Sequence, residues 1–227
     1  METPAIDLKE KLSSSSSSSS NAEDNKSLPP PIINPPITPI ATVSSCYRTK
    51  FGIPRQPGLV SSAVGEIIML PPYNQREAFR GIEAFSHIWV TFLFHLTQRS
   101  TWSPLVRPPR LGGNVKVGVF GTRATHRPNS IGLSVVRLLG VDSSPGRVAL
   151  RVSGLDLVDG TPVLDIKPYL PYADIVPEAT SGFAPIPPPP KLAVMFSPSV
   201  QAKLTDMLIR RPHFQSLVEQ ILMVFNI

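Results

Sequence analysis

Apolar residues along this chain gather into short runs separated by glycine and proline. The clearest run, residues 87–96 (HIWVTFLFHL), is rich in aromatic and β-branched residues, which favour strands. Short strands with turn residues between them are typical of a barrel or a sandwich and not of a parallel βαβ array. Residues 74–84 instead have a helical spacing, which Gly81 interrupts. The pattern predicts about seven strands, at residues 37–48, 65–70, 87–96, 115–123, 131–141, 147–152 and 162–166.

The pattern changes near the end of the chain. Residues 192–196 are one more strand candidate. Ser197 can cap a helix over residues 198–210, which has proline in its first turn. A second predicted helix, 212–224, carries its apolar residues on one face, namely Leu217, Ile221, Leu222 and Val224. We therefore expect a mainly β protein, a small β-barrel with a short α-helical C-terminal tail.

Proline makes up 27 of the 227 residues, about 12% against a usual ~5%, which excludes a helical bundle. The densest stretches, residues 29–36 and 185–190, are typical of extended linkers. They divide the chain into three predicted parts. These are a disordered Ser/Pro-rich extension (1–36), a β-barrel domain (37–176), and a Pro-rich linker with a partial α/β tail (177–227).

Charge is unevenly distributed over these parts. Residues 37–176 hold 15 Lys and Arg against 8 Asp and Glu, a net charge of +7, whereas the whole chain has +6. Residues 1–36 have a net charge of −2 and include eight consecutive serines. The basic part favours an anionic partner such as nucleic acid.

Several classes of protein and site are excluded or disfavoured. No apolar run reaches ~18 residues, so we expect no membrane span. The first residues lack the apolar segment of a secretory signal and are too acidic for a mitochondrial presequence. We expect the cytoplasm, with a Ser-rich plastid transit peptide as the alternative. The single cysteine, Cys46, excludes a disulfide framework and a cysteine-based zinc site.

Metal and nucleotide motifs are also missing from the sequence. His87 and His95 are eight residues apart on one predicted strand, about 26 Å at ~3.3 Å per residue, too far to share an ion. There is no HExxH, GxGxxG or GxxxxGK[ST]. We therefore expect no metal, no Rossmann dinucleotide site and no P-loop.

Two loops are candidates for a binding site. In residues 51–58 (FGIPRQPG), two prolines hold Arg55 and Gln56 in an extended turn. An arginine beside an amide suits a carboxylate, a phosphate or a base edge, although an ordinary surface turn explains it too. Residues 120–132 form a basic loop between two predicted strands, where sites are usually built. The alternative is a solvated basic hairpin.

Two more stretches carry charged groups. Residues 155–169 contain acceptors and donors that could converge on one pocket, or could simply cap a hairpin: Asp156, Asp159, Asp165, Lys167 and Tyr169. Residues 106–113 (VRPPRLGG) are basic, and with neighbouring arginines and Lys116 they could follow a phosphate backbone. Charge that only keeps the protein soluble is the alternative.

Five ordered segments closely resemble the TsaA-like, or TrmO, family of tRNA (adenine-N6)-methyltransferases. They are PRQPG at 54–58, EAFSHIWV at 83–90, RPPRLGG at 107–113, VGVFGTRATHRPNSIGLS at 117–134 and LDLVDGTPVLDIKPYLPYAD at 155–174. The resemblance covers residues 37–176. It implies a small β-barrel methyltransferase fold unlike the Rossmann type, S-adenosylmethionine as the cofactor, and a homodimer. The implied reaction is methylation of N6 of threonylcarbamoyl-adenosine 37 in tRNA, specifically threonine tRNA.

The resemblance also implies site residues. The cofactor site would consist of Pro54, Arg55, Gln56, Phe94, His95, Arg123, Leu133, Asp159, Gly160, Thr161 and Pro162. The candidates for catalysis are Asp159 or Asp165 as proton acceptor, and Tyr169 or Lys167 to orient the base or the threonyl carboxylate. The predicted tRNA contacts are Arg107, Arg110, Lys116, Arg127 and Lys167.

Two other functions remain as alternatives. One is a non-catalytic RNA-binding or adaptor module on the same barrel, although such a module would not need the cofactor motifs. The other is a hydrolase that uses the carboxylates and His95. The bacterial relatives continue beyond the point where this chain stops, with a DPRPAY-like motif. We therefore expect weaker methyl transfer or tRNA selectivity, and intact cofactor binding.

Overall fold

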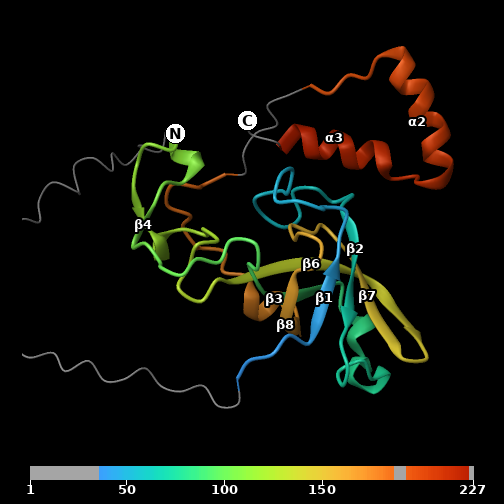
Figure 1. Ribbon diagram of the computed structural model, residues 1–227, viewed down its shortest axis with the longest axis horizontal. Helices are drawn as coiled ribbons and strands as arrows, with labels where there is room; N and C mark the ends of the chain where they lie inside the picture. Colours follow the sequence, from blue (N-terminus) through green and yellow to red (C-terminus); the bar gives the residue numbers. More distant parts are fainter. Residues whose placement is uncertain (1–35, 187–192, 225–227) are drawn as a thin grey trace, which may run out of the picture. The chain divides into compact units, whose positions relative to one another are not determined.

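The computed structural model describes residues 36–186 and 193–224. Within these residues six strands close into an antiparallel barrel, in the order β1-β2-β7-β6-β3-β8 (Figure 1). The barrel strands are β1 (Ala41–Ser44), β2 (Val64–Met69), β3 (His87–Leu93), β6 (Ile131–Ser144), β7 (Arg147–Ser153) and β8 (Pro162–Pro168). This confirms the predicted mainly β barrel. The predicted extension, apart from Pro36, lies outside the described residues.

Strand β6 closes the barrel because it bends. Its first half pairs with β3, and its second half, from Arg137 to Ser144, pairs with β7. The register with β7 shifts between Leu138 and Gly140, where the glycine has a φ of 153°. A bulge of this kind bends a strand and increases its twist, so one 14-residue strand belongs to two sides of the barrel.

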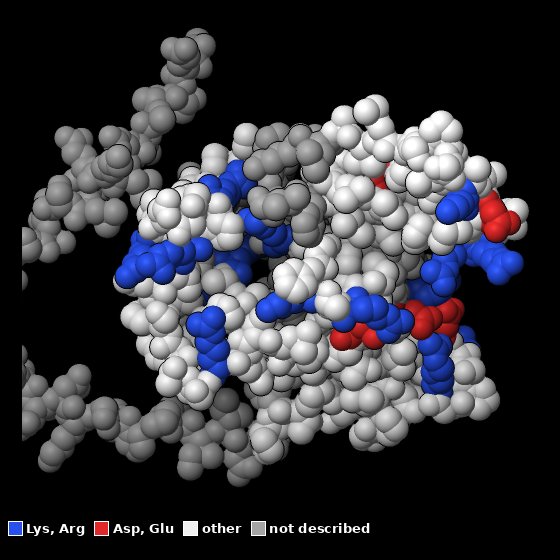
Figure 2. Space-filling view, turned by 45° about the horizontal axis from the view of Figure 1, so that its top comes forward, with Lys and Arg blue, Asp and Glu red and all other residues white. Residues whose placement is uncertain are grey.

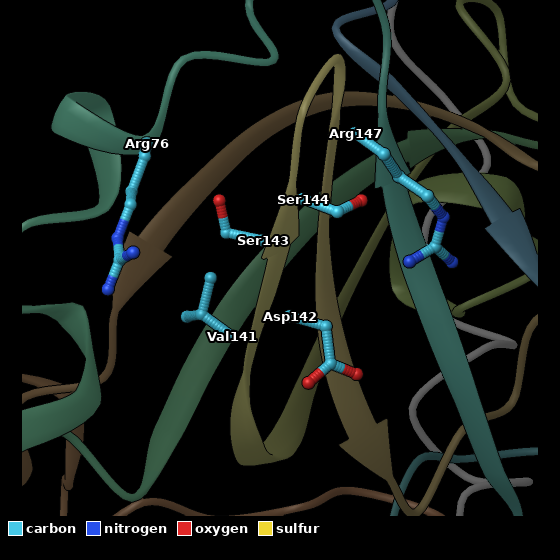
Figure 3. A pocket seen from close by; sticks show the side chains of 6 residues that line it. All are labelled: Arg76, Val141, Asp142, Ser143, Ser144 and Arg147. Carbon is cyan, nitrogen blue, oxygen red and sulfur yellow. The ribbon is translucent and has the colours of Figure 1, made fainter.

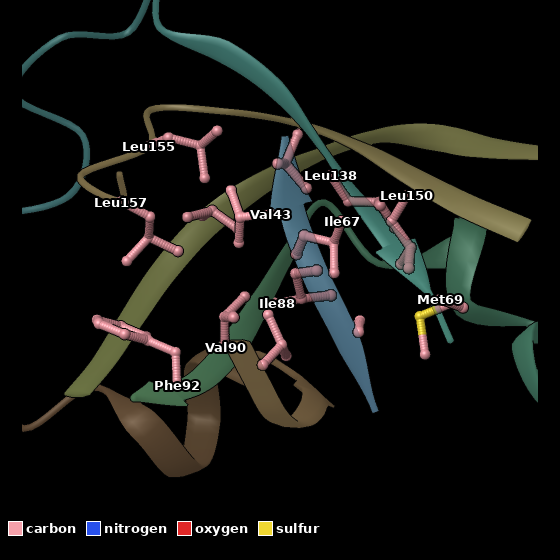
Figure 4. Packing of buried hydrophobic residues seen from close by; sticks show 14 of the residues in the cluster. Val43, Ile67, Met69, Ile88, Val90, Phe92, Leu138, Leu150, Leu155 and Leu157 are labelled. Atoms are coloured by element: carbon pink, nitrogen blue, oxygen red, sulfur yellow. The ribbon is translucent and has the colours of Figure 1, made fainter. Parts of the chain in front are cut away.

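Alternation along the strands fills the barrel interior. In β3 the inward residues Ile88, Val90 and Phe92 are at most 3% exposed, and the residues between them are half-buried. Figure 4 shows them converging in the core with Val43 of β1 and Ile67 of β2. Burying a side chain of this size contributes about 1.5–3 kcal/mol. The interior is therefore a packed core, and functional groups must lie at the barrel's ends or on its outer surface.

The prediction of one strand over residues 115–123 is wrong. This part contains only the two-residue strand β5 (Val117–Gly118), which pairs with β4 (Leu105–Val106) outside the barrel. A 3₁₀ turn, η5 (Val119–Gly121), follows directly. It buries its first residue and leaves Phe120 71% exposed. The 3₁₀ turn ends the extended segment at Gly118, so the strand does not continue.

Two other predicted elements also differ. The helical spacing of residues 74–84 gives two 3₁₀ turns, η2 (Arg76–Phe79) and η3 (Ile82–Ala84), because Gly81 between them is left-handed with a φ of 89°. Residues 193–196 of the predicted strand 192–196 are irregular, while residue 192 lies outside the described part. A closed barrel leaves no free edge with which such a strand could pair.

The predicted helical tail is confirmed. Helix α2 (Pro198–Arg210) begins at Ser197, whose hydroxyl accepts a bond of 3.4 Å from the backbone N–H of Val200. Helix α3 (Phe214–Val224) follows. The other short helical elements within the described residues are η4 (Pro109–Leu111) and α1 (Pro171–Asp174). Among the described residues, no helix combines the length and apolar character needed to cross a membrane.

Candidate functional site at the barrel mouth

One end of the barrel gathers most of the sequence motifs. Strand pairing places the C-terminal ends of β1, β3 and β7 beside the N-terminal ends of β2, β6 and β8. We call this end the barrel mouth. It is formed by the chain segments next to Ser44, Val64, Leu93, Ile131, Ser153 and Pro162. Loops at strand ends can carry polar groups that the packed interior cannot.

Two motifs meet at the mouth although they lie far apart in the sequence. The guanidinium of Arg123, after η5, donates a hydrogen bond to the side-chain carbonyl of Gln56, 67 residues earlier. The loop that carries Gln56 is fixed in turn, since the backbone N–H of Gly58 donates to the carbonyl of Gly154 at 2.9 Å. Pro54 is buried, whereas Arg55 is exposed. The Gln56 amide therefore lies on an anchored loop and faces the Arg123 guanidinium, which comes from a different loop.

Helix α3 supports the same loop from behind. Leu217, Ile221 and Val224 of α3 pack against a small core that includes Tyr47 and Val60. In addition, the backbone N–H of Ser62 donates to the side-chain oxygen of Gln220 at 3.1 Å. The hydroxyl groups of Ser62 and Ser216 bond to each other at 2.7 Å. The C-terminal helix is thus part of the scaffold of the mouth.

The end of β3 adds two aromatic rings and a histidine. The Phe94 ring packs edge-on against Phe92, with 5.1 Å between ring centroids. Both rings lie against Gly132 of β6, where a Cβ would come within 2.3 Å of the Phe92 ring. The Nδ1 atom of His95 is buried, and no group among the described residues bonds to it. Phe94 and His95 therefore offer an aromatic face and an unused polar atom.

The predicted Asp159–Pro162 turn is tied to the end of β1. The Asp159 carboxylate accepts a bond of 2.8 Å from the backbone N–H of Ser45 and one from the guanidinium of Arg48. Its own N–H donates to the carbonyl of Tyr47 at 2.8 Å. Gly160 is left-handed, with a φ of 77°, as the turn requires. Both carboxylate oxygens of Asp159 are thus engaged in holding the turn.

Asp156 reaches the mouth from the same segment and was given no role of its own by the sequence. It lies between the buried residues Leu155 and Leu157, and its carboxylate accepts a bond of 2.8 Å from the hydroxyl of Ser134. Burial raises the pKa of Asp156 to about 6, against the lowering effects of Ser134 and of the Arg123 charge. The sequence indicated it only as one of several acceptors in residues 155–169.

Four predicted site residues lie elsewhere, on the outer surface of the barrel. Leu133 of β6 is 55% exposed, and pairing through Thr91 of β3 places it in line with Asp165 of β8. Asp165 forms an ion pair of 3.3 Å with Lys167, which is further from the mouth. Tyr169 follows and packs on the ring of Trp89, with centroids 5.9 Å apart. Among the described residues, no hydrogen bond or ion pair joins these four to the Gln56–Arg123 pair.

The predicted phosphate contacts are of two kinds. Arg107, Arg110 and Lys116 lie on the exposed excursion that contains β4 and β5. Of these, Arg110 also donates to the backbone carbonyl of Ile186. Arg127 is used inside its own loop, since it donates to the carbonyls of Thr122 at 2.8 Å and Val119 at 3.3 Å. On the face shown in Figure 2, Lys and Arg side chains are widespread and Asp and Glu are few.

A pocket of about 440 Å³ lies at the opposite end of the barrel. Figure 3 shows Arg76 and Arg147 on either side of the serines of the β6–β7 hairpin. Arg147 is paired with Glu66 at 2.8 Å, and Asp142 of this pocket with Arg151 at 3.1 Å. None of the motif residues lines it, so we place the candidate site at the mouth.

By its fold and site, this protein belongs to the class of small closed β-barrels that carry a polar site on the loops at one end. Residues 42–175 match the family described as the tRNA-methyltransferase O N-terminal domain, and the chain belongs to that family. The resemblance seen in the sequence is thereby confirmed.

Three relatives illustrate the similarity. The tRNA (adenine(37)-N6)-methyltransferase of Escherichia coli K12 is 49% identical over 183 residues, 81% of this chain and 78% of the relative. A putative S-adenosylmethionine-dependent methyltransferase of Pseudomonas aeruginosa is 52% identical over 188 residues, covering 82% and 79%. The crystal structure of TrmO from Pseudomonas aeruginosa matches with a TM-score of 0.68 at 45% identity, covering 84% of this chain and 82% of that one.

Proposed function

We propose that this protein transfers a methyl group from S-adenosylmethionine to N6 of adenosine 37 in tRNA. The observation that carries the proposal is the joining of two family motifs at the barrel mouth through Gln56 and Arg123, in a chain about half identical to a tRNA (adenine(37)-N6)-methyltransferase. The finer substrate that we propose is threonylcarbamoyl-adenosine in threonine tRNA, and the compartment we expect is the cytoplasm.

The residues at the mouth fit S-adenosylmethionine in chemical type. The cofactor has an adenine ring with polar edges and an amino acid end with a carboxylate and an ammonium group. Phe94 offers an aromatic face, Gln56 an amide and Arg123 a guanidinium, while His95 has a buried Nδ1 that no described group satisfies. Aromatic stacking and arginine–carboxylate bonds suit these parts. When bound, the cofactor supplies an electrophilic methyl group on a sulfonium.

The protein's task is then to position the two reactants and exclude water. Pro54, Gln56 and Arg123 hold one side of the cofactor site, and the turn of Gly160, Thr161 and Pro162 holds another, fixed by Asp159. In this proposal Asp159 is a positioning residue, because both of its carboxylate oxygens are occupied.

The tRNA would be bound by exposed charge outside the mouth. We propose that Arg107, Arg110 and Lys116 contact phosphates, since they are exposed on the basic excursion. Arg127 would act indirectly, because it holds its own loop. We also propose that Lys167, which is paired with Asp165 on the outer surface of β8, contacts the tRNA.

We also propose a homodimer formed through the outer surface of β3, β6 and β8. Ile131 and Leu133, in the part of β6 that pairs with β3, are each more than a third exposed on this surface. A second subunit there would bring Leu133, Asp165 and Tyr169 close to a cofactor site. This would reconcile their predicted roles with the absence, among the described residues, of a bond to the Gln56–Arg123 pair. Sedimentation of the wild type and of Leu133→Asp tests this: a wild type that sediments as a monomer contradicts it.

The direct test is incubation of the full chain with labelled S-adenosylmethionine and total tRNA, followed by nucleoside mass spectrometry. We expect a methyl group on the modified adenosine 37. Calorimetry would show cofactor binding that Arg123→Ala weakens at least tenfold, whereas Arg147→Ala at the far end leaves it unchanged. Cofactor binding without methylation would favour the adaptor module, and absence of binding would refute the proposal.

A further inference from the structure

The segment between β7 and β8 brings one carboxylate to the inner side of the mouth. Asp156 lies in the chain between Leu155 and Leu157, whose side chains are buried in the barrel core. Its Oδ1 accepts the hydroxyl hydrogen of Ser134 at 2.8 Å, and Ser134 is itself buried on the inward row of β6. Asp156 is thus held where the core meets the barrel mouth, near the loop that carries Arg123.

The other two candidate carboxylates are less suited to accept a proton. Asp159 uses both oxygens to hold the turn against β1. Asp165 faces outward from β8 and is paired with Lys167. Among the described residues, Asp156 forms no ion pair within 4 Å, and Ser134 is the only side chain that bonds to it.

We propose that Asp156 is the general base of the methyl transfer, and that it takes the proton released by N6 of the target adenosine. This inference rests on the proposed function. As the N6–carbon bond forms, the carbon–sulfur bond breaks and its electron pair stays on sulfur. The N6–H proton passes to the Asp156 carboxylate and then to water. Charge balances, because one positive charge on sulfur is replaced by one released proton.

The surroundings suit such a group. Burial raises the pKa of Asp156 to about 6, so near neutral pH it is ionised and yet more basic than an ordinary aspartate. Two neighbours act against the effect of burial, namely Ser134 from β6 and Arg123 from the loop after η5. The Asp156 charge in turn acts on Tyr47 from the segment after β1. Burial raises the pKa of Tyr47, which therefore stays neutral in this range. His95, at the end of β3, is the other titratable side chain that must be tested.

The test is single-turnover methylation of tRNA by the full chain between pH 5 and 9, together with calorimetry of cofactor binding. In the wild type the logarithm of the rate should rise with pH and level off above an inflection near 6. Asp156→Asn should bind the cofactor within about threefold of wild type, lose ~100-fold or more in rate, and lose the rise with pH. Asp142→Asn, an exposed aspartate at the far end of the same sheet, should behave as wild type.

Ser134→Ala provides a second arm that does not remove the carboxylate. The Ser134 bond lowers the pKa of Asp156, so its loss should move the inflection to higher pH. A purely structural effect would reduce the rate without moving the inflection in this direction. This arm still tests the proposal if Asp156→Asn fails to fold.

Three results would overturn the inference. The first is that Asp156→Asn keeps both its rate and its rise with pH. The second is that Ser134→Ala leaves the inflection in place. The third is that the rise persists in Asp156→Asn and vanishes in His95→Gln, which would assign the base to histidine. Failure of the proposed function is distinct, because it would be seen as a wild type that does not methylate adenosine 37.

Discussion

Removing the charge of Asp156 should stabilise the folded protein above pH 6. Folding raises the pKa of this carboxyl from 3.8 to about 6, because its charged form is buried beside Ser134. A group whose pKa is raised by folding binds protons more tightly in the native state. Its contribution to stability is therefore present below pH ~4 and is lost as pH rises through 6.

The size of the effect follows from that shift. About two pKa units correspond to about 3 kcal/mol of differential stability between the protonated and ionised forms. Asparagine keeps the shape and an oxygen for the Ser134 hydroxyl, but it cannot ionise. At pH 8 we expect Asp156→Asn to be more stable than wild type by about 2–3 kcal/mol, or roughly 5–10 °C in Tm. At pH 4 the two proteins should differ little.

Urea denaturation followed by tryptophan fluorescence measures this difference at several pH values. The control is Asp142→Asn, in which an exposed ion pair with Arg151 is lost and little should change at any pH. The reasoning is refuted if Asp156→Asn is no more stable than wild type at pH 8, or if its advantage does not shrink on acidification. A gain in stability together with lost activity would fit a residue kept for function.

Three further outcomes follow from other parts of the structure. Gly132→Ala would place a Cβ 2.3 Å from a phenylalanine ring, so the free energy of unfolding in urea should fall by about 1–3 kcal/mol, while Gly118→Ala, with open space around it, should be tolerated. An unchanged midpoint for Gly132→Ala would contradict this packing. Ile221→Asp should disrupt the contact of α3 with the core behind the cofactor loop and weaken cofactor binding in calorimetry by about fivefold or more, whereas Ile209→Asp, 81% exposed on α2, should not. Equal affinities would separate the helix from the site. Lys116→Ala should reduce the slope of log affinity for tRNA against log salt by about 0.7–0.9 if it contacts one phosphate, and an unchanged slope would remove it from the interface.

The strands could be predicted where one face of the chain meets a packed interior. In β3, inward and outward residues alternate strictly, so the run from His87 onward is strand-like in both composition and period. Residues 115–123 offered similar composition, but the chain enters the turn η5 directly after Gly118, and no barrel edge was available to pair with it. Tertiary structure therefore overrode the local preference of these residues for a strand.

The site could be predicted only as separate motifs. Resemblance indicated both Gln56 and Arg123, but nothing in their spacing shows that a hydrogen bond joins them across 67 residues. The same holds for α3, which supports the cofactor loop from the far end of the chain. Such contacts depend on how the barrel closes, and this depends on pairings between residues distant in sequence.

The carboxylates show why motif resemblance and chemical role need not coincide. Asp159 belongs to the most recognisable turn of the chain, yet its position is explained by bonds to Ser45 and Arg48 that fix that turn. Asp156, three residues earlier, contributes no such bonds to the backbone of another strand, and its burial makes the folded protein less stable when it is ionised. No structural bond of Asp156 requires its negative charge, so the fold alone does not explain this loss of stability. A role in the chemistry at the mouth would explain it. Activity and stability should therefore move in opposite directions in Asp156→Asn, and together in a variant of Asp159.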